Sequence, residues 1–211
     1  MRRRLFVSLT LTLWLAGLVT ASAADLAPLV QATQRLARDP DALTVVWWLP
    51  PAFIEGIMEQ RPMSSEERLE GHQTLAALDA YALFALLHMS RDKSGTLAAA
   101  SRDEVLMNSR LEVQGKSLNA VAPGQVSPEA QKIVDGIRRG LIGSMGLNGQ
   151  ALYIVAYPAE QHGLPVFDPK VAPQFTFHLY GHEFVFSTRL PDIHSVPTAA
   201  IGNTARPRLT S

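Results

Sequence analysis

The sequence predicts an α+β fold, a single compact domain in which a mainly antiparallel sheet packs with about four helices. Helix-like and strand-like segments follow one another in mixed order, and most neighbouring strand-like segments are too closely spaced for crossover helices. The 211 residues are 47% hydrophobic and 18% charged, which is typical of a folded globular chain. No internal repeat or linker divides the chain, so we expect one domain over residues 24–190.

Residues 1–23 have the three parts of a secretory signal peptide. Three arginines follow the first methionine, the run from Leu5 to Val19 is uncharged, and Ala21-Ser22-Ala23 supplies the small residues of a cleavage site. The apolar run is shorter than the roughly 20 residues that cross a bilayer. We therefore expect a cleaved signal, a periplasmic protein and no membrane-spanning segment in the mature chain.

The charge and the cysteine count exclude several classes of function. The expected signal removes three of the 19 basic residues and none of the 19 acidic ones, so the mature chain carries a formal charge of −3. A mildly acidic protein is poorly suited to nonspecific binding of nucleic acid. The chain has no cysteine, which excludes disulfides, thiolate nucleophiles and a lipidated N-terminal cysteine.

The start of the mature chain predicts a helix, a strand and a short helix. Asp25 to Arg38 carries an apolar stripe at helical spacing, and Asp39-Pro40-Asp41 ends it because proline lacks a backbone donor. Leu43 to Leu49 is rich in β-branched and aromatic residues, as in a strand that is apolar on both faces. Pro50-Pro51 ends this strand, and we expect a short helix over Ala52 to Gln60.

The middle of the chain predicts a long core helix and then short strands. Ser64 and the glutamate three residues later have the spacing of a capping box, which opens a helix that ends near Met89. The second half of this helix, Leu75 to Leu87, is apolar on almost every side, so we expect it at the centre of the core. Ser90 to Ser101 reads as a loop, and Asp103 to Val121 as two or three antiparallel strands.

The last part of the chain predicts a helix, a strand and a hairpin. Ser127 and Pro128 are suited to the cap and first position of a helix that runs to about Met145. Leu152 to Tyr157 reads as a central strand, and Gln174 to Thr188 as a hairpin. Residues 191–211 show no period and read as a loose tail.

Three residues on these elements are candidates for a binding surface. Trp47 and Trp48 are adjacent on a strand, so their rings point to opposite faces. Both can fill the core, or one can lie on an exposed surface and anchor a partner or a sugar ring. Asp79 lies inside the apolar run of the expected long helix, where an unpartnered carboxylate would be costly to bury.

Three glycines share one face of the helix expected after Ser127. Gly136, Gly140 and Gly143 are spaced at i, i+4 and i+7. Each glycine costs roughly 1 kcal/mol relative to alanine inside a helix, so three on one face indicate a close approach. Another backbone or a ligand could be the neighbour.

The expected hairpin contains two histidines four residues apart. Its turn can be Tyr180-Gly181, which pairs His178 with Glu183, or Gly181-His182, which pairs His178 with Val185. In both registers the two histidines fail to converge, so we assign no metal site and give them a structural or surface role.

The sequence shows no complete catalytic motif, and we expect no catalytic residue and no cofactor. It favours an exported, non-catalytic binding or interaction module of the bacterial envelope, with another envelope protein or a cell-wall or membrane component as partner. Two alternatives stay open. One is a small-ligand carrier or sensor with a pocket between the glycine-bearing helix and the sheet. The other is a hydrolase that gathers dispersed residues such as His72, Asp79 and His178.

Overall fold

The computed structural model describes residues 26–59, 64–145, 147–161 and 164–191. The expected signal peptide and all of the expected tail except Pro191 lie outside these residues. The helices are α1 (Ala27–Thr33), α2 (Pro51–Glu59), α3 (Ser65–Leu75), the 3₁₀ turn η3 (Ala76–Leu78), α4 (Arg102–Met107), the 3₁₀ turn η4 (Pro123–Gln125), α5 (Pro128–Met145) and α6 (Leu147–Gln150). The strands are β1 (Gln34–Arg38), β2 (Ala42–Leu49), β3 (Tyr81–Arg91), β4 (Leu97–Ala99), β5 (Ser109–Val113), β6 (Lys116–Leu118), β7 (Tyr153–Pro158), β8 (Glu160–Gln161), β9 (Leu164–Pro165), β10 (Gln174–Leu179) and β11 (His182–Ser187).

β3 is the central strand of the larger sheet. On one side it pairs antiparallel with β2, which in turn pairs with β1. On its other side β7 pairs with residues 81–86 of β3, and β4 pairs with residues 89–91. The resulting order is β1-β2-β3-β4, with β7 beside β3. We call these five strands the large sheet.

The small sheet has the strand order β11-β10-β5-β6, and all its pairs are antiparallel. β10 and β11 form the hairpin that the sequence predicts. Its turn residues Tyr180 and Gly181 have φ values of 50° and 79°, the left-handed pair that a two-residue turn of type I′ requires. His178 lies opposite Glu183, so the first of the two expected registers is confirmed.

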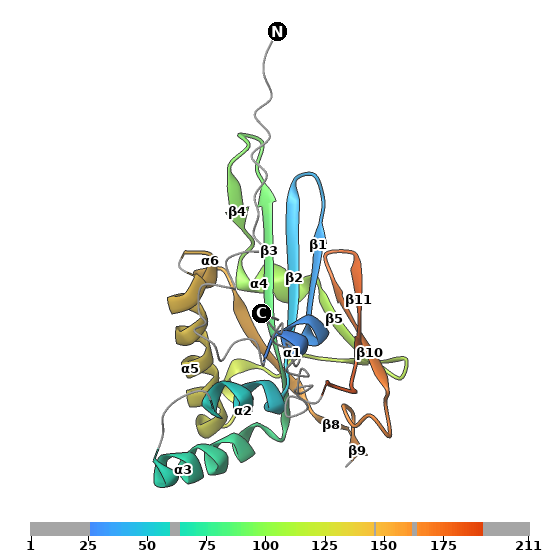
Figure 1. Ribbon diagram of the computed structural model, residues 1–211. Coiled ribbons are helices and arrows are strands. Elements are labelled where there is room, and N and C mark those ends of the chain that lie inside the picture. The colour runs from blue at the N-terminus through green and yellow to red at the C-terminus, as the bar shows by residue number, and fades with distance from the viewer. Residues whose placement is uncertain (1–25, 60–63, 146, 162–163, 192–211) are drawn as a thin grey trace, which may run out of the picture.

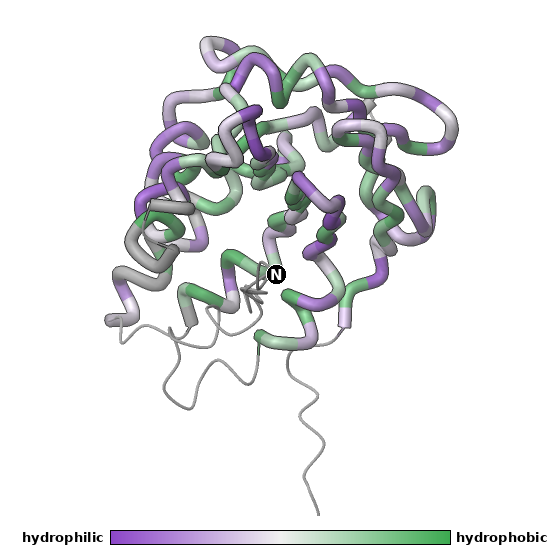
Figure 2. Tube along the Cα trace, turned by 90° about the horizontal axis from the view of Figure 1, so that it is seen from above, coloured by the Kyte–Doolittle hydropathy of each residue, from purple (hydrophilic) through white to green (hydrophobic). Residues whose placement is uncertain are grey.

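The large sheet lies in the middle of three layers. Figure 1 shows α2, α3 and α5 on one side of it and the small sheet on the other. Alternate residues of β3 face the two layers: Phe84 and Leu86 join the core between the sheets, whereas Leu83 and Ala85 join the core beneath the helices. Figure 2 shows the same chain from above, with hydrophobic residues in green and hydrophilic residues in purple. The expected α+β class with antiparallel sheets is thus confirmed.

The expected long helix is wrong in its second half. The capped helix ends at Leu75, and Tyr81–Arg91 forms β3 instead. A run that is apolar at consecutive positions suits a strand buried on both faces as well as a buried helix, and periodicity cannot separate the two. Pairing with β2 and β7, which are distant in sequence, decides for the strand.

Two shorter predictions also need correction. The helix expected from Asp25 to Arg38 stops at Thr33, because Gln34–Arg38 pairs with β2 as its edge strand. The segment from Asp103 to Val121 begins with α4 rather than a strand. Ser101 caps this helix, and its hydroxyl accepts a hydrogen bond from the Glu104 N–H while the Glu104 carboxylate accepts from the Ser101 N–H.

The strand expected over Leu152 to Tyr157 is β7, and it lies at an edge rather than in the centre of its sheet, because within the described residues β3 is its strand partner.

None of the helices in the part of the chain described here is long and apolar enough to cross a membrane.

Candidate functional site

A cleft of about 280 Å³ opens between α5 and the edge of β7. The apolar part of its lining comes from β7, from the segment around η4 and from one position of α5. The polar part comes from α5, from the start of α4 and from Tyr153. The apolar lining residues are Val121, Pro123, Val126, Val134, Ile154 and Ala156, and the polar ones are Arg102, Gln131, Asp135, Arg138 and Tyr153.

The helical wall of the cleft follows from the spacing of residues along α5. Gln131, Val134, Asp135 and Arg138 are spaced at i, i+3, i+4 and i+7, which places them on one face of the helix. The start of α5 is fixed by the Ser127 hydroxyl, which accepts a hydrogen bond from the Ala130 N–H at 3.2 Å. One face of a well-capped helix therefore supplies four of the lining residues.

The cleft carries an excess of positive charge. The Asp135 carboxylate accepts a hydrogen bond from the Gln131 side-chain amide at 2.9 Å. The guanidinium groups of Arg102 and Arg138, in contrast, form no ion pair or hydrogen bond with any residue that the structure describes. Two guanidinium groups and one carboxylate thus line the same cleft, and both guanidinium groups have free donors. Such donors suit a carboxylate or phosphate group, which arginine binds with two parallel hydrogen bonds.

The glycines of α5 do not line this cleft. Gly136 and Gly140 are exposed on the opposite face of the helix, and a Cβ atom added at either would meet no atom within 4 Å. The expectation that another backbone approaches these two positions is therefore wrong. Gly143 lies on α5 as expected, in the part of the helix where only the backbone is described.

Both candidate tryptophans are buried, with exposed fractions of 3% for Trp47 and 4% for Trp48. The Trp47 indole N–H donates to the Thr33 hydroxyl at 3.2 Å, beneath the helical layer. Trp48 packs edge-on against Phe175 in the core between the sheets. The alternative in which both rings fill the core is the one observed, and neither ring forms an exposed anchor.

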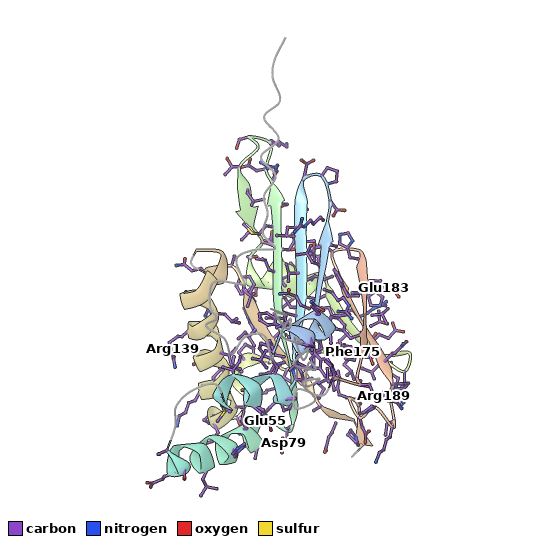
Figure 3. The ribbon with its side chains drawn as sticks, in the orientation of Figure 1. Glu55, Asp79, Arg139, Phe175, Glu183 and Arg189 are labelled. Atoms are coloured by element: carbon purple, nitrogen blue, oxygen red, sulfur yellow. The ribbon has the colours of Figure 1, made fainter. Side chains whose placement is uncertain are left out.

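Asp79 is not part of a helix. It is exposed in the turn between η3 and β3, at the end of the molecule where α2 and α3 lie (Figure 3). The cost of burying its carboxylate therefore does not arise, and this residue lies outside the lining of the cleft.

A second polar cluster lies where the tip of the β10–β11 hairpin meets the large sheet. The rings of His88 and Tyr180 stack with centroids 3.5 Å apart and planes inclined by 9°. The Thr44 hydroxyl is 2.9 Å from His88 Nδ1, and His182 Nε2 is 3.0 Å from an Asp39 carboxylate oxygen. We call these five residues the hairpin-tip cluster.

The surroundings of the hairpin-tip cluster shift the pKa values of its two stacked residues. Burial, and after it the positive charge that His182 carries when protonated, lowers the pKa of His88, while Asp39 acts in the opposite direction. Burial and the nearby Glu104 raise the pKa of Tyr180. His88 is thereby favoured in its neutral form, in which it accepts a hydrogen bond from Thr44 or donates one to it.

The other hairpin histidine lies apart from this cluster. His178 is on the outer face of the small sheet, with its Nε2 3.7 Å from a Glu112 carboxylate oxygen. His178 and His182 therefore do not converge, as the hairpin register predicts. No group of three or more histidine and acidic side chains within the described ranges is placed to hold a metal ion.

Reasoning from the sequence missed the two arginines of the cleft. Arg138 had a local signal, because it shares a helix face with Gln131, Val134 and Asp135 at the spacing given above. Arg102 had no such signal in the sequence, because only the folding of the chain brings it to the face of α5 that lines the cleft. Comparisons with protein-family models, with curated proteins and with solved structures find no match for this chain. The site therefore rests on its own geometry.

Proposed function

We propose that this chain is an exported, non-catalytic binding protein of the bacterial envelope whose α5–β7 cleft takes a small ligand that carries negative charge. The observation that carries this proposal is the pair of unpartnered guanidinium groups, Arg102 and Arg138, in the lining of one cleft. The cleft lies between α5 and the large sheet, which is where the carrier or sensor alternative expects a pocket. Export is supported by the signal-peptide pattern of residues 1–23.

The volume of the cleft limits the size of the ligand. At about 280 Å³ it lies just below the roughly 300–1,000 Å³ that is usual for sites of drug-sized molecules. The apolar residues of the lining add a second requirement, because they favour a ligand with some apolar surface beside its charge.

A hydrolase is the weaker alternative. The histidine with a lowered pKa, His88, lies in the hairpin-tip cluster rather than in the cleft. The hydroxyl closest to it in that cluster belongs to Thr44, which is fully buried and is therefore shielded from a substrate. A perturbed histidine without an accessible nucleophile gives little support for catalysis.

The binding proposal is tested with the mature chain, residues 24–211, by calorimetry and thermal melting against dicarboxylates, phosphate esters, short peptides and neutral sugars. A ligand at 100 times its Kd stabilises a protein by about 2.7 kcal/mol, or about 5–11 °C in a domain of this size. We expect such shifts only with anionic compounds, and we expect Arg102→Gln and Arg138→Gln to abolish them.

Arg139→Gln is the matched control, because Arg139 projects from α5 away from the sheet (Figure 3) and is not part of the lining. An equal loss of binding in Arg139→Gln, or binding of neutral compounds alone, would contradict the proposal. Export is tested separately: the full-length chain expressed in a bacterium is expected in the periplasmic fraction, with Ala24 as its first residue by mass spectrometry.

A further inference from the structure

One side of β7 has backbone groups that no other strand in the described part of the chain pairs with. The Val121 N–H donates to the Ala156 carbonyl at 2.8 Å, from the side opposite β3. The Ala159 N–H, three residues later, donates to the Ala80 carbonyl at 2.9 Å, on the β3 side. Because the backbone groups of successive strand residues point to opposite sides, the N–H and C=O of Ile154 point away from β3, as those of Ala156 do.

This part of the strand edge has no backbone partner within the described residues. Val121 is bonded to β7 at Ala156, and no described residue outside β3 forms a hydrogen bond with Ile154. Ile154 is at the same time part of the lining of the cleft. The unpaired strand edge and the cleft thus share Ile154, and an unpaired strand edge is a surface to which an extended chain readily adds as a further strand.

Both arginines of the cleft come from elements near the start of β7. The Tyr153 hydroxyl donates to the Ala100 carbonyl at 3.2 Å, which places the start of α4, and with it Arg102, beside the first residue of β7. Arg138 lies in the C-terminal half of α5. The start of α5 lies beside the end of β7, because the Ser127 N–H donates to the hydroxyl of Tyr81, the partner of Pro158. The later part of α5 therefore returns toward the start of β7.

We propose that the cleft binds a short peptide in an extended conformation, with a free terminal carboxylate. The peptide backbone exchanges hydrogen bonds with the N–H and C=O of Ile154, and the carboxylate is bound by the guanidinium groups of Arg102 and Arg138. The apolar walls at Val126 and Val134 take a small apolar side chain. This inference rests on the proposed function, since it names the ligand class of the same cleft.

A phosphate ester or a simple dicarboxylate would satisfy the arginines but would leave the strand edge unused. A peptide satisfies both features because its amide groups repeat at the spacing of a strand and its chain ends in an anion. The volume of about 280 Å³ admits only a short segment.

The test compares N-acetyl-Ala-Val-Ala that has a free C-terminal carboxylate with the same peptide as its C-terminal amide. It also uses a series of N-methylated peptides, in each of which a different backbone amide carries the methyl group. Binding to residues 24–211 is measured by calorimetry. We expect the amidated form, and at least one N-methylated form, to bind at least tenfold more weakly than the free acid. In nuclear magnetic resonance spectra the Ile154 amide is expected to shift and to gain protection from exchange. The Val155 N–H, which faces β3, serves as the internal control.

The outcomes separate this inference from the proposed function. Binding of dicarboxylates or phosphate esters that depends on Arg102 and Arg138, without binding of any peptide, overturns the peptide inference and leaves the proposed function standing. Equal binding of all N-methylated peptides without protection of Ile154 also overturns it. If Arg102→Gln and Arg138→Gln still bind the peptide, with the same affinity as the control variant Arg139→Gln, both proposals are overturned.

Discussion

Substitution of Gly136 and Gly140 by alanine is expected to stabilise the protein, although three glycines on one helix face suggested a close approach. Both glycines are exposed in the interior of α5, and a Cβ atom at either position meets nothing within 4 Å. Each substitution is worth about 0.8–1 kcal/mol, because alanine loses less backbone entropy than glycine on helix formation. The double variant is therefore expected to gain about 2 kcal/mol, or about 3–8 °C in melting temperature for a domain of this size.

The gain is measured by urea denaturation of residues 24–211, with an unchanged slope of the unfolding free energy against urea as a condition. Gly115→Ala is the matched control. Its added Cβ also meets no atom within 4 Å, but its φ of 74° is strained for alanine, so this variant is expected to lose stability. Destabilisation by Gly136→Ala or Gly140→Ala would refute the assignment of an open helix face, and an effect of either on ligand binding would move the site to the glycine face.

Three further predictions follow from the core between the sheets, the hairpin tip and the pairing of β3 with β4. Phe84→Ala is expected to cost about 3–5 kcal/mol in unfolding free energy, since the ring is fully buried among the aromatic side chains between the two sheets; a cost below 1 kcal/mol in urea melts would contradict this packing. The pKa of His88 is lowered in the folded state, so the unfolded chain binds more protons below about pH 6.5 and stability falls as the pH decreases through this range. Melting temperatures from pH 8 to pH 5 should show this fall, and His88→Gln should reduce it. Ser90→Cys with Ala98→Cys should form a disulfide, because these residues lie opposite each other in β3 and β4; Ser90→Cys with Leu97→Cys, whose side chains point to opposite faces, should not.

The sequence predicts best where the structural signal is local. The hairpin of β10 and β11 alternates strictly, and a Tyr-Gly turn lies between its strands, so both the element and its set of possible registers could be derived. The helix from Pro128 to Met145 has its own start and stop signals and is found where expected. In both elements the residues that determine the structure lie within some 20 residues of sequence or fewer.

The central strand could not be derived in the same way. Leu83, Phe84, Ala85 and Leu86 are buried whether the segment is a helix or a strand, so their apolar character gives no decision. The decision comes from pairing with β2, which lies about 40 residues earlier, and with β7, about 70 residues later. The same dependence turned Gln34–Arg38 from the end of a helix into an edge strand.

The cleft depends on contacts between distant parts of the chain even more than the central strand does. Its two guanidinium groups belong to different helices, and each arginine alone is an ordinary polar residue of a solvated helix face. They become a candidate site because Tyr153 bonds the segment before α4 to the start of β7 and Ser127 fixes the start of α5 beside the other end of that strand.

The open edge of β7 is the feature that most favours the proposed binding site in the cleft. Proteins usually protect exposed strand edges with charge, proline or a covering segment. Here the chain covers β7 at Ala156, through the Val121 N–H, and then turns away through Pro123 in η4. The next backbone groups toward the start of the strand that point away from β3 belong to Ile154, a residue of the cleft whose charged lining residues are predominantly basic. Positive charge beside a free edge discourages pairing with another copy of the same edge, since two such edges repel each other, whereas it attracts an anionic chain end. We therefore expect the same arrangement to oppose self-association through this edge and, if the proposed function is right, to favour an anionic ligand.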